Sequence, residues 1–471
     1  MLNTKIVIEN SSVAFGTSGA RGLVVDFTPD VCAAFTHAFL AVVQAAFEFK
    51  KIAIAIDNRP SSYKMAQSCA AAALNAGIQP VFYGVVPTPA LAYQSMALGI
   101  PAIMVTGSHI PFDRNGLKFY RPDGEITKTD EQAILAADIA FEALSTLPEL
   151  TISNDAKLAY IDRNKVFANA NLKGMRIGIY EHSSAGRDIY RELFTDLGAD
   201  VISLGRSEVF VPIDTEAVSD EDKARAKDWV SQYQLDILFS TDGDGDRPLL
   251  AGEDGVWLRG DVLGLLCARA LGIEALAIPV SCNTAIEKSG YFAEVERTRI
   301  GSPYVIDAFS AYTSRFSKVA GFEANGGFLL GSDIVFNDRE VKALPTRDAL
   351  LPVLAVLNIA TNGIVPLLQQ LPNRFTASDR IKDFATEKSK AMLLQAIAAP
   401  DEFMSKLGFT SVVTNSVNTV DGFRICLGNG DIVHLRPSGN APELRCYAES
   451  DSEQSANNLV SNTLRKIQLL G

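Results

Sequence analysis

The stretch KIAIAIDNRPSSYKMAQSCAAAALNAGIQPVFYGVV (residues 51–86) decides the fold class of this chain, because it joins two short apolar runs through a helix-like segment. The runs at 51–57 and 80–86 have the character of buried strands, and a second helix-like segment at 88–99 leads into a third run at 101–105. Short buried strands that alternate with helices imply a parallel sheet with right-handed crossovers. Ligands of such sheets gather at the carboxyl ends of the strands.

The same alternation recurs further along the chain, at 175–205 with 235–250, and again between 274 and 321. The tail differs, because residues 419–450 alternate apolar and polar side chains around Asp-Gly and Asn-Gly turn signals before a helix-like segment at 453–470. This pattern is typical of an antiparallel α+β domain. We therefore expect an α/β protein, with three α/β domains of mixed or parallel sheets and a C-terminal antiparallel α+β domain.

Polar or Pro/Gly-containing stretches near Asn154, Ile273 and Asn373 mark the predicted boundaries. The predicted domains are 1–154, 155–273, 274–373 and 374–471.

The composition is that of an ordinary globular protein, with 471 residues, 47% hydrophobic and 21% charged. A net charge of −12 argues against nucleic acid or an anionic membrane as the main partner, since counterion release needs a basic face. The start has no apolar core of signal-peptide length, and no run of about 18 apolar residues occurs. We expect a cytoplasmic protein, a monomer or weak homodimer, whose cysteines are buried free thiols.

One chemically suggestive segment is TGSHIPFDRNGLKFY (residues 106–120), which directly follows the apolar run at 101–105. Ser108 should lie at the carboxyl end of that strand on a Gly-preceded turn, beside His109 and ten residues before Lys118. An exposed serine there can act as a nucleophile or phosphoryl carrier, while His and Lys move protons or balance phosphate charge. The segment alone is equally consistent with a serine that caps the next turn.

A second segment, TDGDGDR (residues 241–247), again follows an apolar strand. Asp242, Asp244 and Asp246 alternate with glycines, so three carboxylates converge, which is costly unless a hard divalent cation lies between them. An EF-hand calcium loop is the rival interpretation, since Glu253 stands at position twelve when Asp242 is position one. Arg247 stands where that loop needs glycine, and the flanks read as strands, so magnesium with a phosphoryl oxygen fits better.

A third segment, RPSGNAP (residues 436–442), offers a guanidinium, a hydroxyl, a glycine amide and an asparagine amide within five residues. These groups are the donors of a phosphate cradle. Taken alone, this string and the FGTSGARG segment (residues 15–22) around Arg21 are as easily plain turns.

Together these segments resemble the α-D-phosphohexomutase family, which comprises phosphomannomutases, phosphoglucomutases and phosphoglucosamine mutases. The segments that carry the resemblance run in order through the whole chain: FGTSGARG, DNRPSS, GVVPTPAL, TGSHIP, GLKFY, DGDGDR, RTRIGS, GFEANGG and RPSGNAPELR. The resemblance implies four domains around one central cleft, and these would carry, in order, the phosphoserine loop, the metal loop, the sugar loop and the phosphate loop.

The resemblance also assigns roles by position. Ser108 would be the phosphoserine, and its phosphate would complete a magnesium site formed by Asp242, Asp244 and Asp246. The residues expected around the transferring phosphoryl group are Arg21, His109 and Lys118, with Lys118 as acid–base partner, and Arg247 would face the sugar. Glu323 and Asn325 would hold sugar hydroxyls. The residues expected to hold the non-reacting phosphate are Arg436, Ser438, Gly439 and Asn440.

The implied reaction is a two-step exchange within one cleft. Phosphoserine gives its group to the sugar, the hexose 1,6-bisphosphate reorients, and the other phosphate returns to Ser108. Transfer of this kind asks mainly for positioning and charge neutralisation. Glucose 1,6-bisphosphate, or the mannose analogue, is the expected activator.

The chain departs from the family pattern in the serine, sugar and phosphate loops. Ile110 stands where many relatives carry Asn, Asn440-Ala441 replaces Thr-Glu, and the sugar loop has Gly327 where others have His, so one proton-transfer partner is missing. These variants, with LPTRDA and LPNRFTASDR, resemble a phosphomannomutase branch. Phosphoglucomutase and phosphoglucosamine mutase remain alternatives.

Two other classes of function compete with a mutase. A metal-dependent phosphatase could use the same serine and aspartates, but it would not need the RPSGN and EANGG loops. A non-enzymatic sugar-phosphate sensor predicts damage at Ser108 or in DGDGDR, and both are intact.

Overall fold

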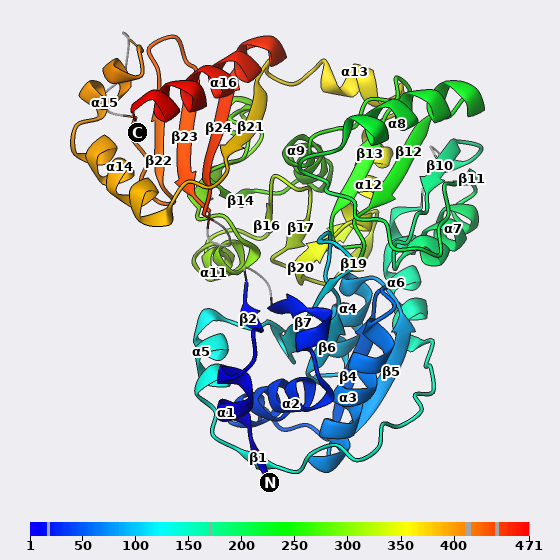
Figure 1. Cartoon of the computed structure of the whole chain (residues 1–471). Coiled ribbons are helices and arrows are strands. Elements are labelled where there is room, and N and C mark those ends of the chain that lie inside the picture. The colour runs from blue at the N-terminus through cyan, green and yellow to red at the C-terminus, as the bar shows by residue number, and fades with distance from the viewer. Residues whose placement is uncertain (17–18, 169–171, 410–415, 439–441, 471) are drawn as a thin grey trace. The chain divides into compact units, whose positions relative to one another are not determined.

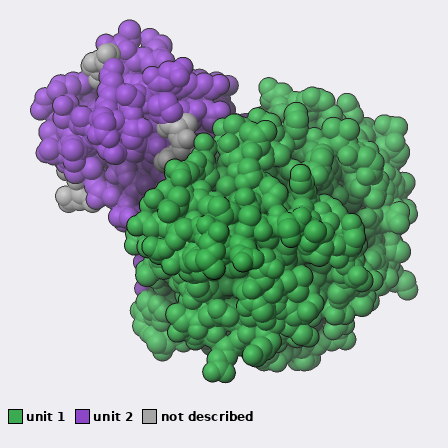
Figure 2. Space-filling view, turned by 60° about the horizontal axis from the view of Figure 1, so that its bottom comes forward, with its two compact units in different colours: residues 1–275, 301–368 green, residues 276–300, 369–471 purple. Residues whose placement is uncertain are grey.

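The computed structural model of the chain (Figure 1) describes residues 1–16, 19–168, 172–409, 416–438 and 442–470. The chain divides into two compact units, coloured separately in Figure 2. Unit 1 comprises residues 1–275 and 301–368, and unit 2 comprises residues 276–300 and 369–471.

Unit 1 opens with a seven-stranded mixed sheet. Its strands are β2 (Ala14–Phe15), β3 (Ala20–Leu23), β4 (Lys51–Ile56), β5 (Gln79–Val85), β6 (Ala102–Val105), β7 (Arg114–Arg121) and β8 (Gly124–Glu125). They lie in the order β2-β3-β7-β6-β4-β5, with β8 on β7. Strand β4 pairs in parallel with β5 and β6, as the alternation at 51–105 predicted, whereas β7 is antiparallel to β6.

The helices of this region are α2 (Pro29–Gln44), α3 (Ser62–Asn75) and α4 (Thr88–Ala97). Helix α2 begins after Thr28, whose side chain accepts a hydrogen bond from the N–H of Val31, with proline in the first turn. It packs on α3 and buries aromatic rings against the sheet, since the centroids of Phe39 and Phe119 lie 4.9 Å apart. This core fixes the sheet from which β6 delivers Ser108.

The second sheet of unit 1 holds the acidic segment. Its strands are β10 (Arg176–Tyr180), β11 (Asp200–Leu204), β12 (Ile237–Thr241) and β13 (Pro248–Ala251), in the order β11-β10-β12-β13. Strand β10 is parallel to both neighbours, and β13 is antiparallel to β12. Helices α7 (Arg187–Asp196) and α8 (Asp220–Tyr233) connect the parallel strands. Residues 242–247 therefore form the tight connection between the antiparallel strands β12 and β13.

A third set of strands in unit 1 is antiparallel: β16 (Val319–Phe322), β17 (Phe328–Leu330) and β20 (Leu344–Asp348). The turn between β16 and β17 is residues 323–327. Helices α9 (Gly260–Leu271) and α12 (Leu350–Ile359) pack on each other, and α11 (Ser302–Thr313) packs on β16. Helix α12 is apolar and almost wholly buried, which is why its sequence shows no polar stripe.

Unit 2 contains the predicted antiparallel tail. Strands β21 (Phe375–Ile381), β22 (Phe423–Cys426), β23 (Ile432–Pro437) and β24 (Leu444–Ser450) lie in the order β21-β24-β23-β22, with every pairing antiparallel. Helices α14 (Thr386–Ala398), α15 (Pro400–Lys406) and α16 (Glu453–Leu470) belong to the same unit. The expected closing helix at 453–470 is confirmed.

The chain contains further α-helices and strands. They are β1 (Leu2–Asn3), α1 (Thr4–Glu9), α5 (Lys128–Ala136), β9 (Ala140–Phe141), α6 (Asp155–Asn164), β14 (Ala275–Pro279), α10 (Ala285–Lys288), β15 (Glu294–Thr298), β18 (Ile334–Phe336), β19 (Arg339–Val341) and α13 (Ile364–Leu368).

The predicted fold class is confirmed: the chain is a mixed α/β protein that ends in an antiparallel sheet with helices. The three predicted domain boundaries remain a prediction. All six cysteines are free, and of these Cys426 alone is half-buried rather than buried. Among the helices of the described part of the chain, none is both long and apolar enough to cross a membrane.

Candidate active site

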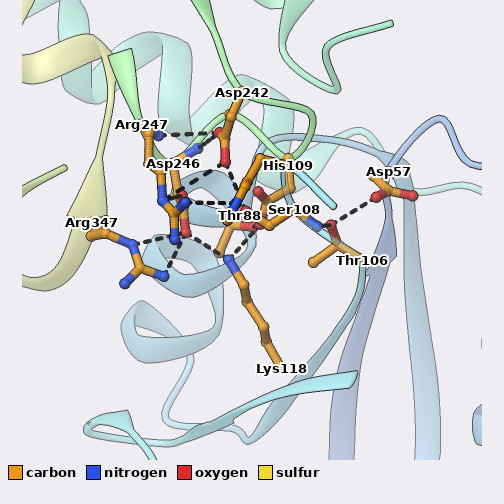
Figure 3. Close-up of polar contacts among 12 residues, drawn as sticks. Asp57, Thr88, Thr106, Ser108, His109, Lys118, Asp242, Asp246, Arg247 and Arg347 are labelled. Atoms are coloured by element: carbon orange, nitrogen blue, oxygen red, sulfur yellow. Dashed lines mark hydrogen bonds and ion pairs between the residues drawn. The ribbon is translucent and has the colours of Figure 1, made fainter. Parts of the chain in front are cut away.

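The serine loop leaves the carboxyl end of β6 and turns back at Ser108, whose φ of 53° is unusual for a residue with a side chain. The hydroxyl of Thr106 stabilises this turn, because it accepts a hydrogen bond from the N–H of Ser108 at 2.8 Å and donates one to Asp57 at 2.7 Å. The Ser108 hydroxyl donates to Oδ2 of Asp242 at 2.8 Å (Figure 3). The strained turn therefore aims the serine at the acidic loop.

The side chain of Arg59 binds the backbone of the serine loop. Its guanidinium pairs with Asp57 at 3.1 Å and lies 3.9 Å from the centroid of the Phe210 ring. It also donates to four backbone carbonyls of the loop, those of Ser108 at 2.9 Å, Ile110 at 2.5 Å, Pro111 at 2.7 Å and Arg114 at 2.9 Å. A side chain at Gly107 would place its Cβ 2.5 Å from Cζ of Arg59, so the glycine is needed for this close approach.

The acidic loop between β12 and β13 brings Asp242, Asp244 and Asp246 together in a fully buried position. One oxygen from each lies within 4.8 Å of the others. Oδ1 of Asp244 and Oδ1 of Asp246 are buried without a hydrogen-bond partner. Unpartnered buried carboxylate oxygens that converge in this way are the donor set of a hard divalent cation, so the three residues fit a metal ion.

The three carboxyl groups differ in their electrostatic surroundings. Burial, followed by the charges of Asp244 and Asp246, raises the pKa of Asp242 well above its usual value. Burial alone would also raise the pKa of Asp246, but Arg347 and Lys118 hold it below its usual range. The ammonium of Lys118, on β7, lies 2.5 Å from Asp244 and 2.6 Å from Asp246. The chain itself therefore places one positive charge, the ammonium of Lys118, against the acidic cluster.

Basic side chains surround the serine on its other sides. Arg247 donates to Nδ1 of His109 at 2.7 Å, and Arg21 donates to the carbonyl of Thr106. Burial and then the charge of Arg247 lower the pKa of His109 to about 4, so the imidazole is neutral near pH 7. Burial lowers the pKa of Arg21 to about 10, which still leaves it charged. These groups suit an anion held beside Ser108.

The loop at 323–327 is a tight turn, in which the N–H of Gly326 donates to the carbonyl of Glu323 at 2.9 Å. The side-chain oxygen of Asn325 accepts a hydrogen bond from the N–H of Gly327 at 3.0 Å, and its backbone carbonyl accepts one from the hydroxyl of Thr215 at 2.8 Å. Its Nδ2 lies 3.5 Å from Oε2 of Glu323. Glu323 and Asn325 therefore sit side by side in unit 1, together with the serine and acidic loops.

The phosphate-loop candidates lie in unit 2. Nε of Arg436 pairs with Asp421 at 3.0 Å, and the N–H of Ser438 donates to the carbonyl of Glu443 at 2.8 Å. Gly439 and Asn440, also expected in the cradle, fall outside the described residues.

The structure adds residues that the sequence reasoning did not single out. Those that support the site are Asp57, Arg59, Thr88, Thr106 and Arg347. Thr88, for example, donates to Oδ2 of Asp244 at 2.7 Å. Each lies in a segment quoted in the sequence analysis (DNRPSS, GVVPTPAL, TGSHIP and LPTRDA). The segments therefore marked these regions as functional, but the sequence did not show which residues contact each other.

Comparison with protein families matches three parts of the chain. Residues 12–142 match the family described as "Phosphoglucomutase/phosphomannomutase, alpha/beta/alpha domain I", residues 259–377 match "alpha/beta/alpha domain III", and residues 383–466 match the "C-terminal domain".

Full-length relatives agree with these matches. The chain is 57% identical over 468 residues to a phosphomannomutase of Salmonella muenchen, covering 99% of this chain and 98% of that protein. It is 42% identical to a phosphomannomutase of Sinorhizobium fredii, covering 96% of this chain and 98% of that protein.

Solved structures share the fold at low sequence identity. A phosphoglucomutase/phosphomannomutase family protein of Burkholderia thailandensis has a TM-score of 0.73 at 18% identity and covers 100% of this chain and 98% of its own. N-acetylphosphoglucosamine mutase of Aspergillus fumigatus, solved with GlcNAc-6P and magnesium, has a TM-score of 0.59 at 14% identity, covering 99% of this chain and 98% of its own.

Proposed function

Since the chain belongs to the phosphoglucomutase/phosphomannomutase family and is therefore a phosphohexomutase, we propose that it interconverts mannose 6-phosphate and mannose 1-phosphate through a phosphoserine at Ser108. The identity of 57% to a phosphomannomutase over nearly the whole chain supports the choice of sugar. The observation that carries the mechanism is the buried Ser108 hydroxyl, 2.8 Å from a carboxylate of a three-aspartate cluster that also binds the ammonium of Lys118.

In the proposed first half-reaction, the bond from phosphorus to Oγ of phosphorylated Ser108 breaks while a bond to a sugar hydroxyl oxygen forms. The ammonium of Lys118 gives a proton to Oγ of Ser108 as that bond breaks. The amine of Lys118 then takes the proton that the sugar hydroxyl loses. The second half-reaction is the reverse, at the other end of the hexose 1,6-bisphosphate. A bisphosphate of glucose or mannose is therefore the expected activator, because it regenerates phosphoserine.

The neutral His109 and the charged Arg21 and Arg247 are proposed to bind the transferring phosphoryl group, whose charge spreads over its outer oxygens in the transition state. Arg247 is also proposed to face the sugar. Holding these donors in place before the reaction avoids reorganisation cost during it.

Asp242, Asp244 and Asp246, with an oxygen of the Ser108 phosphate, are proposed to hold Mg²⁺. Bound there, the ion would supply positive charge against the phosphoryl oxygens. The two buried carboxylate oxygens without hydrogen-bond partners support this assignment.

The substrate's other groups are proposed to bind away from Ser108. Glu323 would accept hydrogen bonds from sugar hydroxyls, and the amide of Asn325 would donate to them or accept from them. The non-reacting phosphate would bind Arg436, Ser438, Gly439 and Asn440.

The test is a coupled assay that compares mannose 1-phosphate, glucose 1-phosphate and glucosamine 1-phosphate at equal concentration, with the matching bisphosphate added. We expect the highest kcat/KM with the mannose compound. Peptide mass mapping should find phosphate on Ser108 in part of the purified protein. Ser108→Ala should lose nearly all turnover. Ser95→Ala should keep it, because Ser95 is a buried serine on α4 whose hydroxyl donates to the carbonyl of Ala92 in the same helix. Full activity in Ser108→Ala refutes the phosphoserine, and a faster glucose reaction refutes the choice of sugar.

A further inference from the structure

Arg347, near the end of β20, is an arginine with 2% exposure that joins the metal loop to the sugar loop. Its Nε and Nη2 lie 3.1 and 2.9 Å from Oδ2 of Asp246 (Figure 3). Its Nη1 lies 3.1 Å from Oε2 of Glu323 and 3.1 Å from the hydroxyl of Ser302. One side chain therefore contacts two proposed substrate- or metal-binding residues, neither of which it adjoins in sequence.

The sugar loop leaves room for this arginine at Gly327. A Cβ on Gly327 would lie 2.4 Å from Cδ, 2.6 Å from Cγ and 2.9 Å from Cβ of Arg347, far inside van der Waals contact. The φ of Gly327 is not in the left-handed region, so its backbone would accept another residue. The close approach of Arg347 is therefore the physical reason for glycine at this position.

A third acid completes the surroundings of Arg347. Glu125 accepts hydrogen bonds from Thr346 at 2.6 Å and from Ser302 at 3.0 Å. Burial alone would lower the pKa of Arg347, but the charges of Asp246, Glu323 and Glu125 raise it well above its usual value. Arg347 is thus a permanent buried cation and cannot act as a proton acceptor at neutral pH.

The contacts also determine which carboxylate oxygens remain available. Oδ2 of Asp246 accepts hydrogen bonds from Arg347 and Lys118, while Oδ1 of the same residue has no hydrogen-bond partner and lies 3.6 Å from Nε of Arg247. Both hydrogen bonds from the guanidinium and the one from Lys118 end on Oδ2, so this oxygen is held in place by three donors. Held in this way, Asp246 presents Oδ1 to the acidic cluster.

We propose that Arg347 is a positioning residue of the mutase, admitted by Gly327, which aligns Asp246 of the metal loop with Glu323 of the sugar loop. The proposal rests on the proposed function, since it takes those two residues to bind metal and sugar. A purely structural role for Arg347 is the rival, and it predicts a loss of stability without a specific effect on the site.

The first test is a double-mutant cycle of Arg347→Met and Gly327→Ala, assayed with mannose 1-phosphate below the unfolding temperature of every variant. Arg347→Met should lower kcat by roughly 100-fold, since misplaced site residues cost about that much. Gly327→Ala should lower kcat as well, because its Cβ displaces Arg347. The double variant should be no worse than Arg347→Met, since methionine holds no ion pair that the new methyl group could break and is free to turn away from it. Additive losses would overturn the role of Gly327.

The second test measures Mn²⁺ binding by electron paramagnetic resonance and needs no turnover. Arg347→Met removes a positive charge 2.9 Å from Asp246, so Mn²⁺ should bind more tightly, by roughly three- to tenfold, although activity falls. Arg347→Lys should restore wild-type Mn²⁺ affinity and part of kcat. If Mn²⁺ affinity is unchanged in Arg347→Met, Arg347 does not act on Asp246, and this result would overturn the proposal.

The matched control is Arg163→Met, which removes another buried arginine of unit 1. Arg163 is 6% exposed on α6, donates to the carbonyl of Lys342 at 2.8 Å and lies 4.8 Å from the centroid of the Tyr93 ring, and neither partner is a proposed site residue. It should lose stability but keep kcat and Mn²⁺ affinity. If Arg347→Met behaves in the same way, Arg347 is structural only. If wild-type protein turns over no hexose phosphate, the proposed function fails, whereas the Mn²⁺ measurement still decides whether Arg347 tunes the acidic cluster.

Discussion

Arg59→Met tests whether the buried guanidinium of Arg59, through its hydrogen bonds to the serine loop, sets the position of Ser108. The guanidinium of Arg59 is the shared donor of the loop, because it pairs with Asp57 and hydrogen-bonds to four loop carbonyls. Methionine keeps much of the stem volume but removes the charge and all of these donors. The change therefore leaves Asp57 buried with only hydroxyl and amide donors.

The expected magnitude follows from that geometry. Breaking a buried ion pair by removing one partner costs about 3–5 kcal/mol. Asp57 is 1% exposed and Arg59 is 3% exposed, so solvent screens the pair little. The loop carbonyls can partly recover by turning toward water, which places the expected loss of unfolding free energy near the lower end of that range. Turnover should fall by roughly 100-fold, because Ser108 loses its fixed position.

The assay separates the ion pair from the loop contacts. Denaturant unfolding and kcat are measured for Arg59→Met and for Arg59→Met combined with Asp57→Asn, and hydrogen exchange is followed in residues 106–118. Asp57→Asn removes the unpaired charge, so the double variant should regain about 1–2 kcal/mol of stability. It should not regain turnover or slow exchange in the loop, because the carbonyls still lack their donor. If the double variant recovers kcat, the unpaired charge of Asp57 rather than the lost loop contacts displaces Ser108, and our account of Arg59 is wrong.

The remaining predictions concern other parts of the site and unit 2. Asp244→Asn should weaken Mg²⁺ binding and lower kcat while the fold survives, and chelation of the wild type should have the same effect; activity that resists chelator would contradict a metal-assisted transfer. Arg436→Ala should lower kcat/KM by a factor worth roughly 2 kcal/mol for every sugar phosphate, whereas Glu323→Gln should change the mannose-to-glucose ratio; the opposite pattern would show that the phosphate and sugar ends are misassigned. Burial lowers the pKa of His434 to about 4, below the unfolded value near 6.5, so its contribution is complete above pH 6.5 and is lost as pH falls toward 4. The difference in unfolding free energy between wild type and His434→Gln should therefore shrink by about 2 kcal/mol from pH 7 to pH 5, and a constant difference would show that His434 is not buried neutral.

Local features of the chain made much of the fold predictable. The apolar runs near Lys51 and Ala102 have strand length and are followed by turn residues, and both became parallel strands of one sheet. The alternation of apolar and polar residues around Phe423 became an antiparallel hairpin. It was predictable because a period of two shows that one face of each strand is buried. The antiparallel partner strands β7 and β13 were not distinguished, because a short apolar run does not show the direction of its neighbour.

The sequence by itself determined the position of Ser108 at the end of a buried strand and the convergence of Asp242, Asp244 and Asp246, because each depends on residues only a few positions apart. Tertiary structure alone decided what surrounds them. Arg347 reaches Asp246 across 101 positions of the chain, and its fit against Gly327 depends on two strands of one sheet. Periodicity and spacing show which residues of a segment are buried. The partner of a buried charge instead depends on which distant segments meet in the low-dielectric interior, where an unpaired charge is costly.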